Sequence, residues 1–108
     1  MMIESVRLVM QAAKREEVRQ ALVAWRNPVM VEQGCLGCRI LQESGDSRSI
    51  WYIAEWASED DLLRHLREDH YKQLLNLMET ACQPPLIQFH RVVETAGLEL
   101  VEQARNAV

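Results

Sequence analysis

The chain carries strand-like and helix-like patterns in an order that few folds accommodate. Two strand-like runs, residues 35–43 and 49–56, are separated only by the turn-forming stretch 44–47, so they predict an antiparallel hairpin. A strand-like run and a helical stretch precede the hairpin; two helical stretches and a last strand-like run follow it. The order β-α-β-β-α-β predicts a ferredoxin-like α+β fold, with a four-stranded antiparallel sheet and helices on one face.

Residues typical of helix ends refine this prediction. The first helix is expected over 14–27, where Pro28 should kink it or start a short second turn, and Gly34 should end it in a left-handed conformation. Ser58, with Asp61 three residues later, is typical of a helix N-cap. A break between the two later helices is expected near 68–69.

Both faces of the expected sheet are apolar. Trp51 and Ile53 alternate with Tyr52 and Trp56 along one strand, whereas an antiparallel sheet with one face in water should alternate apolar with polar residues. We therefore expect a second copy of the chain to cover the open face, in a two-fold homodimer.

Length and charge restrict the remaining possibilities. The 108 residues suit a single domain over 1–95, with 96–108 as a C-terminal extension that is helical or contacts the partner. A net charge of -4 disfavours nucleic acids and anionic membranes as partners. The chain has no apolar run of the ~20 residues that span a bilayer, and no signal-peptide pattern at its start, so we expect a cytoplasmic protein.

Cys35 and Cys38 form a C-x-x-C pattern, but the pattern opens a strand rather than a helix. Strand alternation should send the two side chains to opposite faces. No second pair of cysteines or nearby histidines completes a zinc site. We expect structural cysteines and no metal, with disulfide exchange as a minor alternative.

An indole and two imidazoles gather where the third strand meets the following helix. Trp56 shares its face with Tyr52, and His65 lies at the edge of the buried helix stripe, where an imidazole can act as a base or proton relay. His70 follows at a helix start. The structural alternatives are a core tryptophan, a histidine bonded to backbone and a capping histidine.

The segments Gly34-Cys35-Leu36-Gly37, Glu55-Trp56-Ala57-Ser58, His65-Leu66 and Asp69-His70-Tyr71 resemble the antibiotic biosynthesis monooxygenase family in their order and spacing. The resemblance is to its quinol-monooxygenase-like members. It implies a dimeric α+β barrel and an oxygenase without a cofactor. The chain departs from the family at Ala54, where many members have an acid. It also lacks the asparagine and the haem-ligating histidine of the haem-degrading branch.

The resemblance implies a small monooxygenase that oxidises an aromatic phenol or quinol with O₂, without cofactor or metal. His65, Trp56 and His70 are the expected catalytic residues, and Tyr52, Trp56 and Arg39 the expected substrate contacts. The alternative is a non-enzymatic dimeric module that binds a small aromatic molecule.

Overall fold

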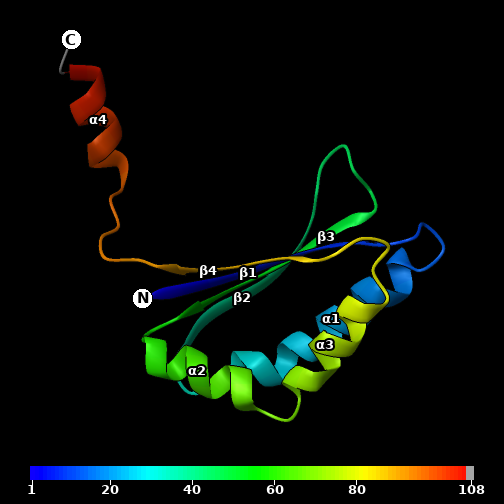
Figure 1. Ribbon diagram of the computed structural model, residues 1–108. Coiled ribbons are helices and arrows are strands. Elements are labelled where there is room, and N and C mark those ends of the chain that lie inside the picture. The colour runs from blue at the N-terminus through cyan, green and yellow to red at the C-terminus, as the bar shows by residue number, and fades with distance from the viewer. Residues whose placement is uncertain (107–108) are drawn as a thin grey trace.

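The computed structural model describes residues 1–106, and its elements follow the expected order (Figure 1). The strands are β1 (Met2–Val9), β2 (Cys35–Gln42), β3 (Ser49–Trp56) and β4 (Leu86–Arg91), and the helices are α1 (Arg15–Met30), α2 (Glu59–Arg67), α3 (Tyr71–Glu79) and α4 (Leu98–Asn106). The sheet order is β2-β3-β1-β4, and all neighbouring strands are antiparallel. The ferredoxin-like α+β prediction is thereby confirmed.

The helices α1, α2 and α3 lie together on one face of the sheet, and α4 stands away from the body on the other side (Figure 1). The core fills the space between the sheet and these three helices. Its largest fully buried side chains include those of Trp56, Tyr52, Leu22 and Leu74. Burial of such side chains contributes roughly 1.5–3 kcal/mol each, so this layer holds the fold together.

The central strand β1 places one acidic residue inside this core. Met2, Glu4, Val6 and Leu8 alternate along β1 and all face the helices. Glu4 pairs in register with Ala54 on β3 and with Phe89 on β4. A carboxylate is thus built into the middle of the covered sheet face.

Helix ends agree with the sequence in part. Ser58 caps α2, because its hydroxyl accepts a hydrogen bond from the Asp61 N–H at 3.1 Å, and α2 and α3 are separated by residues 68–70. Of the two outcomes predicted at Pro28, a separate short turn is wrong, because α1 continues through Pro28 to Met30, whereas a kink at Pro28 stays a prediction. The fully buried Val29 packs in the core, and its burial compensates for the hydrogen bond that proline cannot donate.

Gly34 adopts the expected left-handed conformation, with φ of +82°, but it lies in the turn before β2, after the helix end at Val31. A Cβ at this position would collide with the Asp61 carboxylate. The Gly34 carbonyl also accepts the Ala57 N–H at 2.8 Å. Glycine is needed here both for φ and for close approach of the turn to the start of α2.

The two cysteines of the C-x-x-C pattern lie on one face, so the prediction of opposite faces is wrong. A bulge makes Leu36 an extra residue, with Cys35 opposite Trp56 and Cys38 opposite Ala54 on the helix side. Both thiols are free, and burial raises the pKa of Cys38 to about 12. That disfavours the thiolate on which disulfide exchange depends.

The C-terminal arm beyond β4 carries apolar side chains with little to cover them. Val93 is 93% exposed, and Leu98, Leu100 and Val101 of α4 are also exposed. The radius of gyration is 16.1 Å, whereas a compact domain of this length has about 13 Å. Among residues 1–106, no helix has the length and apolar character that a membrane crossing requires.

Candidate functional site

A fully buried carboxylate, that of Glu4, lies at the centre of the site. Its Oε1 accepts the Tyr52 hydroxyl at 2.8 Å and the Trp56 indole N–H at 3.2 Å. Its Oε2 accepts the Tyr71 hydroxyl at 3.2 Å. His65 Nε2 lies 3.2 Å from Oε1. We call these five residues the Glu4 cluster. Donors from β3, α2 and α3 thus compensate for the cost of burying this charge.

His65 connects the cluster to a second carboxylate. Its ring stacks on Trp56 with 4.4 Å between centroids, and its Nδ1 lies 2.9 Å from Glu32 Oε2. Burial lowers the pKa of His65, but the carboxylates of Glu4 and Glu32 outweigh burial, so the net pKa is raised. An imidazole between two carboxylates can donate from both nitrogens when it is protonated.

A second imidazole, that of His70, extends the hydrogen-bonded chain from His65 and Glu32 to the surface. His70 Nε2 lies 2.9 Å from the same Glu32 oxygen, and the Trp25 indole N–H donates to the His70 carbonyl at 2.8 Å. Side-chain exposure rises from 0% for His65 to 12% for Glu32 and 24% for His70. We call Glu4, His65, Glu32 and His70 the relay, because its groups can pass a proton between the core and solvent.

The tyrosines of the cluster are hydrogen-bond donors. Burial, together with the neighbouring Glu4 charge, raises the pKa of both Tyr52 and Tyr71. Tyr52 also packs edge-on against Trp25, with centroids 5.0 Å apart. Both hydroxyls therefore remain protonated at neutral pH and hold the Glu4 carboxylate in place.

Apolar side chains are exposed on β4, beside Glu4. Ile87 and Phe89 are on the helix-facing side of β4, opposite Val6 and Glu4, yet they are 42% and 43% exposed. Arg91 of the same strand reaches the helix layer and pairs with Glu59 at 2.8 Å. The edge strand next to Glu4 therefore presents apolar surface to solvent.

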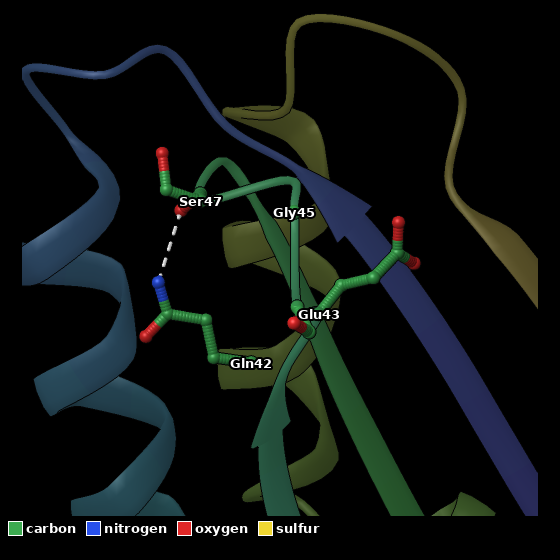
Figure 2. A pocket seen from close by; sticks show the side chains of 5 residues that line it. Gln42, Glu43, Gly45 and Ser47 are labelled. Carbon is green, nitrogen blue, oxygen red and sulfur yellow. Dashed lines mark hydrogen bonds between the residues drawn. The ribbon is translucent and has the colours of Figure 1, made fainter.

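Surface hollows lie elsewhere. One of about 480 Å³ lies at the β2–β3 turn. Figure 2 shows residues that line it, among them Gln42, whose amide donates to the Ser47 carbonyl. A second, of about 120 Å³, lies between α1 and α3, beside Val18 and Leu77. Neither includes a residue of the Glu4 cluster or the relay.

The structure brings together most of the site residues expected from the sequence. Trp56, Tyr52, His65 and His70 belong to the cluster or the relay. Arg39 is apart from them: it pairs in register with Ile53 on the other sheet face, and its guanidinium contacts Glu55 at 3.4 Å. Within one chain, Arg39 cannot line the same pocket as Tyr52 and Trp56.

Sequence reasoning missed Glu4, Glu32 and Tyr71 as site residues. For Glu4 a signal existed, because an acid alternating with Met2, Val6 and Leu8 indicates a buried, partnered charge. Tyr71 lies at the start of a helix, where its spacing with Leu74 and Met78 indicates a core residue rather than a site residue. Glu32 lies in a turn, where no periodic pattern marks it.

The chain matches the family model described as "Antibiotic biosynthesis monooxygenase" over residues 1–76. That range contains the whole Glu4 cluster and the whole relay. No curated protein sequence is similar enough to count as a match.

The similarity to solved structures with the same fold covers more of the chain than the family match does. A provisionally named antibiotic biosynthesis monooxygenase from Caulobacter crescentus is 27% identical, with a TM-score of 0.75 over 86% of this chain and 91% of that one. A similarly named protein from Deinococcus radiodurans is 18% identical, with a TM-score of 0.83 over 90% and 97%. A conserved protein from Methanosarcina mazei is 24% identical, with a TM-score of 0.76 over 83% and 91%.

Proposed function

The chain belongs to the antibiotic biosynthesis monooxygenase family, and from this membership we propose that it oxidises an electron-rich phenol or quinol with O₂, without a cofactor. The family match supports a monooxygenase-like function in general terms. The phenolic substrate class rests on the chemistry of the Glu4 cluster.

One observation carries the proposal: a buried carboxylate with spare accepting capacity. Glu4 Oε1 faces three donors, whereas Oε2 accepts only from Tyr71. A carboxylate oxygen has two lone pairs, so Oε2 can accept one further proton donor. The hydroxyl of a bound phenol is such a donor.

Removal of that proton makes the substrate reactive. A phenol has a pKa near ~10, so a positioned base is needed to form the phenolate at neutral pH. The phenolate passes an electron to O₂, and the radical pair recombines at a ring carbon. A hydroquinone and O₂ then give a hydroxyquinone and water, so the substrate supplies every electron and no other reductant is required.

The residues have separate roles in this scheme. Glu4 accepts the phenolic proton, and His65 passes it through Glu32 to His70 at the surface. Tyr52 and Trp56 hold Glu4 and form the aromatic wall. The substrate ring enters beside Phe89, whose half-exposed side chain must move to uncover Glu4. Arg39 has no part in this scheme.

The activity test is oxygen uptake with simple hydroquinones in buffer that contains a chelator. We expect turnover by the wild type and a loss of about 10²-fold or more in His65→Gln and Trp56→Phe. His90→Gln, which changes an exposed histidine of β4, is the matched control and should keep full activity.

Two outcomes would decide against the proposal. Wild-type protein that binds hydroquinone in calorimetry but consumes no O₂ supports the alternative, a module that binds a small aromatic molecule. Equal turnover in His65→Gln and the wild type would exclude the relay from the reaction.

We further propose that the chain works as a homodimer, as family members usually do. On the open sheet face Leu41 and Leu86 are exposed, and the arm carries further uncovered apolar residues. A second copy would bury this surface. Sedimentation should show a dimer that Leu41→Lys weakens, whereas Leu63→Lys on α2, which is equally exposed, should leave it intact. A stable wild-type monomer at micromolar concentration would contradict the dimer.

A further inference from the structure

We propose that Glu32, His65 and His70 form a binding site for one divalent first-row transition metal ion, such as Fe²⁺, Co²⁺ or Zn²⁺. Each residue offers one ligand atom, and the three atoms lie within 4.8 Å of one another. They come from the α1–β2 turn, from α2 and from the start of α3. The fold thus brings two imidazoles and a carboxylate from distant parts of the chain to one point.

The spacing of the ligand atoms suits a metal ion. Glu32 Oε2 lies 2.9 Å from His65 Nδ1 and 2.9 Å from His70 Nε2. Metal–ligand bonds of about 2.0–2.2 Å place neighbouring ligand atoms roughly 3 Å apart. Two of the three distances between ligand atoms therefore match those around a bound ion.

Neighbouring groups orient both imidazoles, as the outer partners of metal ligands do. His65 Nε2 faces the buried Glu4 carboxylate at 3.2 Å, which keeps the proton on Nε2 and leaves Nδ1 free for a metal. Trp56 stacks on the same ring, and the Trp25 N–H holds the His70 backbone.

The local charge also suits a divalent cation. With neutral imidazoles, Glu4 and Glu32 give the site a charge of -2 within a buried region. Proton and metal use the same atoms, since Glu32 accepts from both imidazoles when no ion is bound. A divalent ion would balance both carboxylates.

Access and donor type narrow the choice of metal. Glu32 and His70 are partly exposed, so an ion can enter from solvent. Two imidazoles and one carboxylate leave coordination positions open, a donor set found with non-haem Fe²⁺ and with catalytic Zn²⁺. Ca²⁺ and Mg²⁺, which prefer oxygen ligands, are disfavoured.

The test uses the full chain, freed of metal and titrated with Co²⁺ by calorimetry and visible absorption, without substrate. We expect one ion per chain, a Co²⁺ absorption band, and binding at least about tenfold weaker in Glu32→Gln and His70→Gln. Glu68→Gln and His90→Gln, which change exposed residues outside the site, should bind as the wild type does.

The proposal is overturned if the wild type binds no Co²⁺, or if Glu32→Gln and His70→Gln bind it as the wild type does. Both variants change partly exposed side chains, and circular dichroism establishes that they fold. Because no substrate is present, this outcome is independent of oxygen uptake: either proposal can fail while the other stands.

Discussion

Two polar clusters share the strand β1, and they lie on opposite faces of the sheet. Glu4 faces the helices and is fully buried among tyrosine, tryptophan and histidine donors. Arg7, three residues later, faces the open side, where it contacts Glu43 at 3.2 Å and Asp46 at 3.4 Å while partly exposed.

The two clusters differ in whether water can form hydrogen bonds in place of a lost protein partner. Around Arg7, solvent can replace any partner that is lost, so the ion pairs contribute little to stability. Glu4 is shielded from solvent, so water cannot replace a donor that is removed, and the carboxylate is left with an unpaired acceptor. The inner cluster is therefore the one that both stability and chemistry should depend on.

The largest expected effect comes from Glu4→Gln. The amide has one accepting oxygen instead of two, so its NH₂ group replaces an acceptor either at the Tyr71 hydroxyl or at the N–H donors of Trp56 and His65, and the negative charge is lost. We expect a loss of about 3–5 kcal/mol in the free energy of unfolding, measured by urea titration. Glu43→Gln on the open face is the control and should change little. If Glu4→Gln is as stable as the wild type, the buried Glu4 cluster contributes no more to stability than the Arg7 cluster on the open face.

A smaller effect is expected from Tyr71→Phe. The change removes the single donor to Glu4 Oε2 and should cost about 1–2 kcal/mol by urea titration. In the Glu4→Gln background the same change should cost clearly less, because the two side chains are coupled. If the losses of stability from Glu4→Gln and Tyr71→Phe simply add in the double variant, the two side chains are not coupled and this prediction is wrong.

The smallest effect concerns the open face and depends on pH. The Trp51 indole N–H and the Arg7 guanidinium lower the pKa of Glu43 below its ordinary 4.5. A lowered carboxyl pKa stabilises the folded state above the ordinary value, and this contribution is lost as pH falls through the folded value. The stability difference between the wild type and Glu43→Gln should therefore shrink as pH falls below the ordinary carboxyl value of 4.5, and it should also shrink in high salt. A difference that stays constant from pH 7 to pH 3 would contradict this account.

Much of the fold could be predicted because each element carries its own local signal. The hairpin turn and the Ser58 cap depend on neighbours in sequence, and both appear in the structure. No separate turn starts at Pro28, because the local preference of proline is outweighed by the burial of Val29. The C-x-x-C pattern was misjudged because a bulge at Leu36 changes which face each cysteine meets.

The site was harder to predict than the fold because its acids come from places without a periodic signal. The histidines and Trp56 lie close together in sequence, near one strand-to-helix junction. Glu4 and Glu32 reach them from other segments, 61 and 33 residues before His65. Only the packing of β1 and α1 against that junction makes them one site.

The turn at Gly34 has a consequence for how mutations in this chain are interpreted. Gly34 lies two residues from Glu32 and touches Asp61, which is itself held by Ser58 and Arg64. A methyl group at Gly34 would push the turn away from α2 and carry the Glu32 carboxylate with it. In a mutational scan, Gly34→Ala would therefore have the same phenotype as loss of the Glu32 carboxylate, although it removes no functional group.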